Sequence, residues 1–119
     1  IREKLRMLAI VPDDHEARAM LGLLYMRQGR YEEAAEAYRL ATRLAPDSSR
    51  YHNNLGNALL LSGQTDRAVS AFERAVDLDP GYARPRGMLA QLYAKQGRTE
   101  EAEKQRAAYR RLTGDEEIR

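Results

Sequence analysis

Apolar residues recur along this chain at intervals of three and four positions, which is the spacing of amphipathic helices. At regular distances the pattern is interrupted by a glycine and then, further along, by a proline. Both residue types end helices, because glycine readily adopts the left-handed conformation of a helix C-cap and proline cannot continue a helix. The pattern therefore predicts pairs of α-helices joined by tight turns.

The whole pattern repeats every 34 residues. A shift by this period superimposes Pro12, Pro46 and Pro80; Leu21, Leu55 and Leu89; Gly29, Gly63 and Gly97; and Ala34, Ala68 and Ala102. A repeat of this length predicts a solenoid in which neighbouring helix pairs stack on one another. Helices whose axes lie about 8–10 Å apart need small side chains where they cross. The expected crossings are Gly22 with Ala34, Gly56 with Ala68, and Ala90 with Ala102.

The first two segments share a more detailed pattern of leucine, glycine, a large residue, alanine, an aromatic residue, alanine and proline. The matching positions are Leu21, Gly22, Tyr25, Ala34, Tyr38, Ala41 and Pro46, and then Leu55, Gly56, Leu59, Ala68, Phe72, Ala75 and Pro80. This pattern resembles the tetratricopeptide repeat (TPR) family. The basic residues are almost all Arg, as in GC-rich bacterial genomes, so a bacterial-type TPR domain is expected. The resemblance implies an all-α, right-handed α-solenoid of TPR helix-turn-helix repeats.

The third segment departs from the family pattern. Ala90 stands at the glycine position, Arg106 at the aromatic position and Tyr109 at the following alanine position. We expect this repeat to be degenerate and terminal, with a polar second helix, because the ends of a solenoid need a solvated face. In all three segments the family's first-helix tryptophan is replaced, by Arg18, His52 and Arg86.

The period divides the chain into a half repeat, three complete repeats and a short charged tail. The expected boundaries are residues 1–11, 12–45, 46–79, 80–114 and 115–119. The half repeat corresponds to the second helix of a preceding TPR, and it is either a capping helix or the cut end of a longer array. Because the first residue is Ile rather than Met, we expect a fragment or a processed chain.

Capping residues indicate where the helices begin. Asp13 and Glu16 have the spacing of a capping box, which predicts a first helix over about residues 14–28. Asp47 or Ser48 is expected to cap the first helix of the second repeat.

The composition narrows the classes of function. The net charge of +2 is small and basic residues are interspersed with acidic ones, whereas nucleic-acid binders usually carry a concentrated basic stripe. We therefore expect no nucleic-acid partner. No apolar run approaches the roughly 18 residues of a membrane span. The absence of cysteine excludes disulfides but does not decide between a cytoplasmic and a periplasmic location.

No arrangement of residues points to catalysis. His15 and His52 lie in successive repeats with no cysteine and no third ligand, so we expect neither to bind a metal ion. Every glycine is explained by a helix crossing, a turn or a cap, which leaves none for a phosphate-binding loop. We therefore expect no metal, no cofactor and no enzymatic activity.

The first helices carry a second stripe of residues that helix pairing does not require. In proteins that this one resembles, the first helices line the concave surface of the superhelix, where a segment of another protein binds. The resemblance therefore implies a protein-protein interaction module or scaffold. The candidate binding residues are Met20, Leu23, Arg27, Arg50, Asn53, Asn54, Asn57, Arg84, Met88, Gln91 and Lys95.

Two residue types in this stripe leave alternatives open. Asparagine has poor helix propensity, so Asn53, Asn54 and Asn57 need a reason beyond folding. They provide either polar packing between adjacent repeats or hydrogen bonds to the backbone of a ligand. Methionine is common on adaptable binding surfaces, but it also fills gaps between packed helices.

Arg50 and Arg84 occupy equivalent places at the start of successive first helices, whereas Glu16 holds that place in the first repeat. Helix N-termini add partial positive charge there. We expect an acidic side chain or C-terminal carboxylate of the partner beside the two arginines, unless they pair with Asp47 or Asp79 instead. The alternative function is a self-assembling scaffold that forms homo-oligomers through its terminal repeats.

Overall fold

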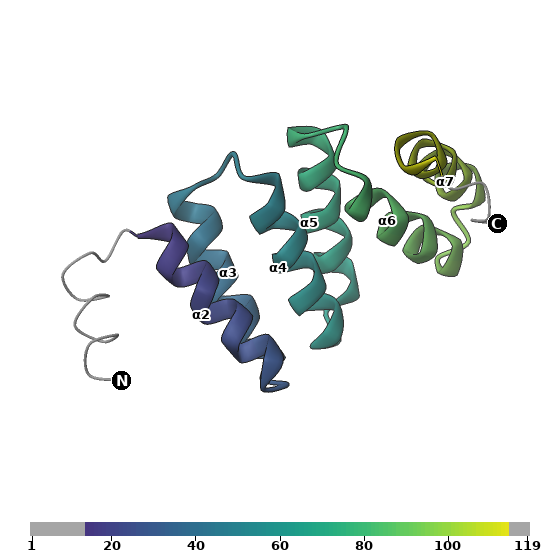
Figure 1. Ribbon diagram of the computed structural model, residues 1–119. Coiled ribbons are helices and arrows are strands. Elements are labelled where there is room, and N and C mark those ends of the chain that lie inside the picture. The colour runs from purple at the N-terminus through teal and green to yellow at the C-terminus, as the bar shows by residue number, and fades with distance from the viewer. Residues whose placement is uncertain (1–13, 115–119) are drawn as a thin grey trace, which may run out of the picture.

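The computed structural model describes residues 14–114, which form six α-helices in three pairs (Figure 1). They are α2 His15–Arg27, α3 Tyr31–Leu44, α4 Ser49–Leu61, α5 Thr65–Leu78, α6 Ala83–Lys95 and α7 Thr99–Thr113. No strand occurs between residues 14 and 114. This confirms the predicted all-α fold. The half repeat over 1–11, the tail over 115–119, and Pro12 and Asp13 lie outside the described residues.

Each helix packs against the helix that follows it in the sequence, and contacts between more distant helices are few. The pairs therefore stack in order along an elongated molecule, with extents of 49 × 25 × 22 Å (Figure 1). The core is continuous through the stack. Tyr38, Leu55, Phe72 and Leu89 come from four different helices and belong to one apolar cluster. This is the solenoid that the 34-residue period predicts.

The same turn joins the two helices of every pair. It contains a glycine with positive φ, which is 74° at Gly29, 87° at Gly63 and 78° at Gly97. In the first pair the amide of Arg30 donates to the carbonyl oxygen of Tyr25 at 2.9 Å. This is the hydrogen bond of a Schellman motif, in which the left-handed residue is usually glycine. The prediction that these glycines end the first helices is confirmed.

Short polar side chains cap two of the first helices. Oδ1 of Asp14 accepts hydrogen bonds from the amides of Glu16 at 2.9 Å and Ala17 at 3.2 Å. Oγ of Ser48 accepts one from the amide three residues on, at 3.2 Å, which confirms Ser48 as a cap. The predicted capping box of Asp13 with Glu16 is wrong, because α2 begins at His15 and Asp14 therefore takes the capping position.

A close contact between a glycine and an aromatic ring sets the crossing of the helices in the first two pairs. A Cβ atom at Gly22 would lie 2.9 Å from ring carbons of Tyr38, and one at Gly56 would lie 2.7 Å from the ring of Phe72. Only glycine lets a ring lie so close to the backbone. The sequence pattern paired these glycines with alanines of the second helices. Their nearest neighbours are instead the aromatic residues one turn further along.

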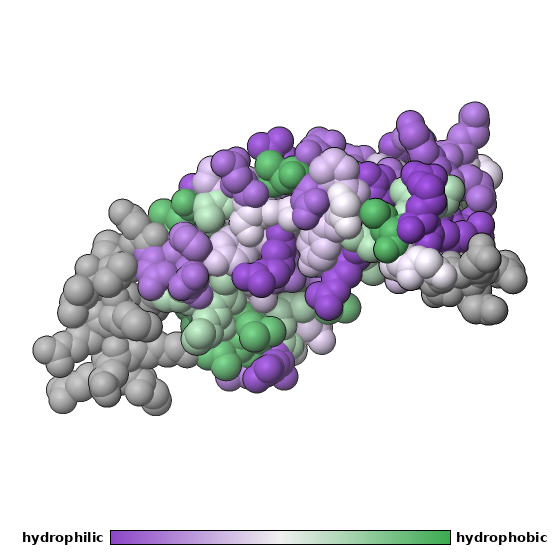
Figure 2. All heavy atoms as spheres, turned by 45° about the horizontal axis from the view of Figure 1, so that its top comes forward, coloured by the Kyte–Doolittle hydropathy of each residue, from purple (hydrophilic) through white to green (hydrophobic). Residues whose placement is uncertain are grey.

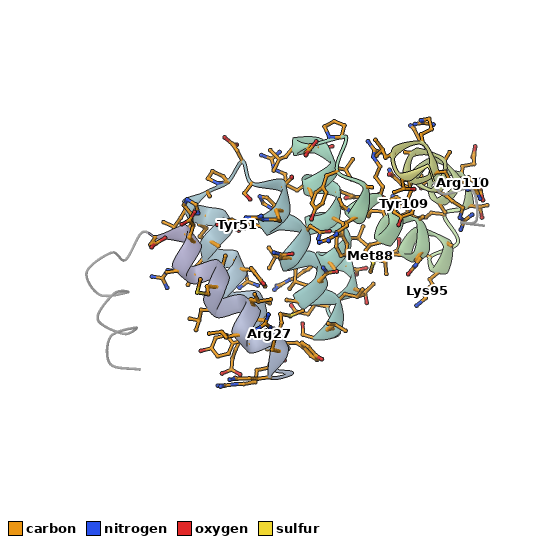
Figure 3. All side chains as sticks on the ribbon, viewed as in Figure 1. Arg27, Tyr51, Met88, Lys95, Tyr109 and Arg110 are labelled. Atoms are coloured by element: carbon orange, nitrogen blue, oxygen red, sulfur yellow. The ribbon has the colours of Figure 1, made fainter. Side chains whose placement is uncertain are left out.

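The third pair makes a similar contact one helical turn away. A Cβ atom at Gly87 would lie 3.1 Å from the ring of Tyr109, which lies between α7 and α6 (Figure 3). Gly87 precedes Ala90 by three residues, and Tyr109 follows Arg106 by three. Because the two helices are antiparallel, both residues have moved by about one turn in the same direction. The departures of this repeat from the family pattern therefore leave it with a glycine-aromatic contact in a shifted position.

We expect the Gly56→Leu variant to unfold at a lower denaturant concentration than the wild type. Overpacking a well-packed crossing costs about 1–3 kcal/mol or more. Circular dichroism during chemical denaturation measures the difference. Gly81→Ala is the control, because a Cβ atom there would meet only Oδ1 of Asp79, at an ordinary 3.6 Å. A Gly56→Leu variant as stable as this control would show that the crossing is not as described.

We also expect Tyr109→Ala to destabilise the chain more than Arg106→Ala does. Replacing a fully buried aromatic residue by alanine costs about 3–5 kcal/mol, so about 2 kcal/mol is expected for the partly buried Tyr109. Arg106 instead pairs with the exposed Glu103 of its own helix, and pairs with an exposed partner contribute at most about 1 kcal/mol. Equal losses of unfolding free energy in the two variants would contradict the shifted crossing.

Candidate protein-binding surface

Equivalent residues of α2, α4 and α6 form rows across the stack, because the repeat period places them at the same height in successive helices. From the start of the helices to their end, the rows are Glu16, Arg50 and Arg84; Met20, Asn54 and Met88; Leu23, Asn57 and Gln91; and Arg27, Leu61 and Lys95. All of these residues are exposed or partly exposed. This set is the first-helix surface. Arg27 and Lys95 mark the row at its end in Figure 3.

The apolar part of the first-helix surface lies on α2 and at the end of α4. Met20 is 58% exposed, Leu23 44% and Leu61 54%. Figure 2 shows a hydrophobic patch in the region of α2. Single exposed apolar residues need no explanation, but several on one surface are typical of an interaction site. Leu61 was not among the predicted binding residues, although the repeat period places it level with Arg27 and Lys95.

Methionine was expected either on a binding surface or in the gaps between helices, and the structure contains both cases. Met20 is exposed on the first-helix surface. Met26 and Met88 are partly buried and pack against the hydrophobic core. Met26 and the buried part of the Met88 side chain therefore fill seams between helices. Met20 does not, because it is exposed.

Asn53 lies in the seam between α4 and α6 and not on the first-helix surface. Its side chain is 2% exposed, and its Nδ2 donates to the hydroxyl of Tyr82, the residue that precedes α6, at 3.4 Å. Polar packing between repeats therefore accounts for the Nδ2 of Asn53, whereas its buried Oδ1 has no hydrogen-bond partner within residues 14–114; the side chain is not accessible to a partner protein. This corrects its place among the candidate residues. Asn54 and Asn57 are partly exposed, so ligand contact stays a prediction for them.

Arg50 and Arg84 are exposed in the first turns of α4 and α6. Within the part of the chain that the structure describes, neither makes an ion pair, so the alternative of pairing with Asp47 or Asp79 is not found. A positive charge at a helix N-terminus is unfavourable by roughly 0.3–1 kcal/mol. Arg50 forms a hydrogen bond with the side chain of Tyr51, but no acidic group neutralises either arginine within residues 14–114. Glu16, in the same row, carries the charge that the helix dipole favours.

The arginines at the turns, by contrast, make structural contacts that the sequence analysis missed. The guanidinium of Arg30 lies 4.8 Å from the ring centre of Tyr25 and forms an ion pair with Glu33. The hydrogen bond from Arg30 holds the pKa of Glu33 below its usual value. Arg98 makes the equivalent contacts in the third repeat. The second repeat replaces all three residue types together, by Leu59, Gln64 and Arg67. Because the three positions change together between repeats, the sequence itself contained a signal that these residues contact one another.

One histidine contacts the next repeat, and the other contacts the turn before its own helix. Nδ1 of His15 is 2.9 Å from the hydroxyl oxygen of Tyr51, and Nε2 of His52 donates to the carbonyl oxygen of Pro46 at 3.1 Å. Burial lowers the pKa of His52, so its ring is neutral near pH 7. Between residues 14 and 114, no group of three or more His, Cys, Asp or Glu residues is placed to hold a metal ion.

No helix among residues 14–114 is both long enough and apolar enough to span a membrane.

We expect Asn53→Asp to lower the free energy of unfolding by about 2 kcal/mol or more at pH 7, because a buried carboxylate without a cationic partner is costly. The loss should shrink as the pH falls toward about 4. Burial raises the pKa of the new carboxyl in the folded state, so the penalty is present above the unfolded pKa of about 3.9 and disappears below it. Denaturation curves across this pH range measure both effects.

Asn54→Asp is the matched control for this experiment, because Asn54 neighbours Asn53 but is partly exposed. A surface substitution of this kind should change the free energy of unfolding by no more than about 0.5 kcal/mol. If the two variants are equally stable, Asn53 is not buried in the seam.

Family models of the tetratricopeptide repeat match the chain over residues 3–49 and 19–83, and over residues 59–118. No curated protein matches it. A crystal structure of MamA has a TM-score of 0.85 and 24% identity, with 93% of this chain and 65% of that chain covered. MamA from Desulfovibrio magneticus RS-1 has a TM-score of 0.83 and 20% identity, with 95% of this chain and 64% of that chain covered. This chain therefore spans less than two thirds of the length of either.

A mutant of the Thermobaculum terrenum O-GlcNAc transferase is 40% identical, with a TM-score of 0.69. The match covers 77% of this chain but only 18% of the transferase. At identities below 25%, the likeness to MamA shows the fold alone.

The TPR fold in general serves as a non-catalytic interaction module. The family models extend over almost all residues of the sequence, and the described residues have the predicted glycine turns and stacked helix pairs. The chain therefore belongs to the tetratricopeptide repeat family.

Proposed function

We propose that this chain is a protein-interaction module, without enzymatic activity, that binds a segment of a partner protein across the first-helix surface. The observation that carries the proposal is the pair Arg50 and Arg84. Both are exposed, neither has an ion-pair partner within residues 14–114, and both lie where the helix dipole disfavours positive charge. Exposed charges that no acidic residue neutralises are candidates for binding.

The rows of the first-helix surface suggest how the segment would lie. An acidic side chain or C-terminal carboxylate would approach Arg50 and Arg84 at the start of the helices. The amides of Asn54 and Asn57 would form hydrogen bonds to the partner's backbone in the middle of the surface. Apolar side chains would cover Met20, Leu23 and Leu61, which together are the most exposed large apolar residues of the first helices.

The two kinds of contact would have different roles. Exposed charge contacts contribute at most about 1 kcal/mol each, so the arginines would set the orientation of the segment more than its affinity. Covering exposed apolar area contributes about 25 cal/mol per Å² before the costs of association are subtracted, so Met20, Leu23 and Leu61 would supply most of the affinity. The partner should therefore combine an acidic group with several apolar residues.

We expect the Arg50→Glu, Arg84→Glu double variant to bind the partner more weakly while folding at least as stably as the wild type. Negative charge at the starts of α4 and α6 agrees with the helix dipole, so the free energy of unfolding should stay the same or rise by up to about 1 kcal/mol per site. A partner identified by pull-down and then purified allows both quantities to be measured, by calorimetric titration and by denaturation.

The control is Lys104→Glu with Arg111→Glu, which changes the net charge equally but lies at exposed positions of α7. Binding to the first-helix surface should fall with the first pair of substitutions and not with the second, and added salt should weaken it. Unchanged affinity of the Arg50→Glu, Arg84→Glu variant, with its fold intact, would refute the orientation proposed for the segment. Light scattering on the free protein distinguishes partner binding from self-assembly.

A further inference from the structure

A groove with basic walls runs between α3 and α5 on the side of α4 that faces away from the first-helix surface. Its volume is about 650 Å³, and it is open to solvent along its length. Its floor is formed by Leu55, Leu59 and Ala71, which are nearly buried. Its walls carry Arg39 and Arg43 from α3, His52 from α4, and Arg67, Ser70 and Arg74 from α5.

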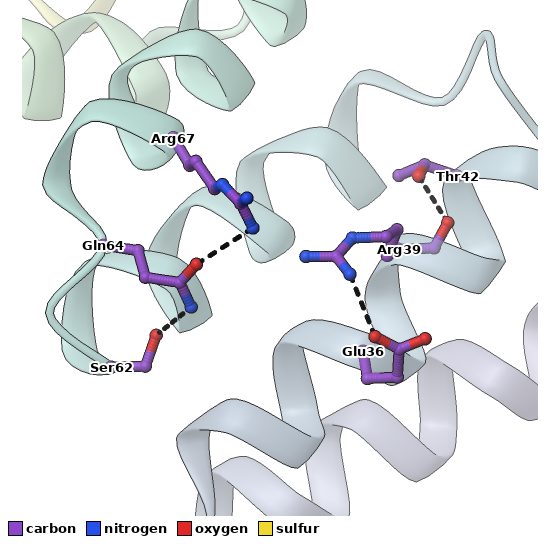
Figure 4. Close-up of polar contacts among 6 residues, drawn as sticks. All are labelled: Glu36, Arg39, Thr42, Ser62, Gln64 and Arg67. Carbon is purple, nitrogen blue, oxygen red and sulfur yellow. Dashed lines mark hydrogen bonds and ion pairs between the residues drawn. The ribbon is translucent and has the colours of Figure 1, made fainter.

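No acidic residue lines this α3/α5 groove. Arg39 forms an ion pair with Glu36 at 2.9 Å, and Arg67 donates to Oε1 of Gln64 at 3.2 Å. Figure 4 shows the guanidinium groups of Arg39 and Arg67 directed into the space between their helices. Arg43 and Arg74 are exposed and make no ion pair with any residue from 14 to 114. Like charges gathered in one groove repel each other, so the arrangement does not serve folding.

The next groove along the stack carries the opposite charge. It lies between α5 and α7 and is lined by Glu73, Asp77 and Tyr93, among others. Glu73 and Asp77 stand one period after Arg39 and Arg43, so equivalent positions of successive repeats are basic in one groove and acidic in the other. Both grooves lie between the second helices of successive repeats. The basic character of the α3/α5 groove is therefore a property of this repeat and not a requirement of the fold.

We propose that the α3/α5 groove binds an acidic, apolar-containing segment of a partner protein, with its carboxylates on Arg43 and Arg74 and its apolar side chains on Leu55 and Leu59. The segment should be acidic because the walls of the groove are basic, and it should carry apolar side chains because the floor is aliphatic. Single-stranded nucleic acid is disfavoured, because proteins that bind it stack its bases on aromatic rings, and the lining of this groove has no Phe, Tyr or Trp.

The α3/α5 groove and the first-helix surface use different residues of the same helix. His52, Leu55 and Leu59 of α4 face the groove, whereas Arg50, Asn54 and Asn57 belong to the first-helix surface. The two sites can therefore be occupied at the same time. They can also be tested separately, because no residue is shared between them.

The test uses a fluorescently labelled synthetic peptide in which Glu and Leu alternate, and a second peptide in which Lys replaces Glu. Fluorescence anisotropy is measured at about 0.15 M salt, where the Debye length of about 8 Å screens distant charges. We expect saturable binding of the Glu peptide only. Arg43→Glu with Arg74→Glu should weaken that binding at least tenfold, whereas the control Lys104→Glu with Arg111→Glu, at exposed positions of α7, should change it less than threefold. Circular dichroism verifies that both variants are folded.

Four outcomes would overturn the proposal. They are no saturable binding of the Glu peptide, equal weakening by the α7 control, weakening by Arg50→Glu with Arg84→Glu but not by Arg43→Glu with Arg74→Glu, and tighter binding of a single-stranded RNA oligonucleotide that Arg43→Glu with Arg74→Glu abolishes. Light scattering adds a fifth. If the wild type self-associates and the Arg43→Glu, Arg74→Glu variant is monomeric, the occupant of the groove is a second copy of this chain. None of these results contradicts the first-helix proposal, and the third would support it.

Discussion

The contact between a glycine backbone and an aromatic ring is the constraint on which the rest of the stack depends. At Gly56 a Cβ atom would lie only 2.7 Å from the ring of Phe72, so the ring packs directly on the backbone of α4. Because each helix also packs against the next pair, the crossing sets the position of its neighbours. Gly87 and Tyr109 show that the contact itself is required rather than its place in the repeat, since they form it one turn away from the usual positions.

Once the crossings and turns are fixed, the remaining positions of each repeat are free to vary, and they vary mainly in charge. The row that begins the first helices changes from Glu16 to Arg50 and Arg84, and the walls of the grooves between second helices change from arginine to Glu73 and Asp77. Substitutions at exposed positions alter the free energy of folding little. A solenoid can therefore carry different charges on successive repeats without losing its fold, which is the physical basis of both proposed binding sites.

The candidate site could be predicted as a set of rows but not residue by residue. Asn53 and Asn54 are adjacent and chemically identical, yet Asn53 is 2% exposed and contacts Tyr82 of the next repeat, whereas Asn54 is partly exposed. Adjacent positions on a helix differ by about 100° in direction, so the exact angle at which repeats meet decides which side chain enters the seam. The same angle leaves Leu61 exposed at the end of α4.

The sequence by itself determined the helices, the glycine turns and the order of the repeats, because capping, left-handed glycine and apolar periodicity act over a few residues along the chain. It also determined that Arg50 and Arg84 share a row, since equivalent positions follow from the period alone. Only the tertiary structure decided that Tyr109 packs on Gly87, that Asn53 is buried, and that four arginines line one groove with no acid among them. Each of these depends on the distance and angle between elements that are far apart in sequence. Local rules do not specify either quantity.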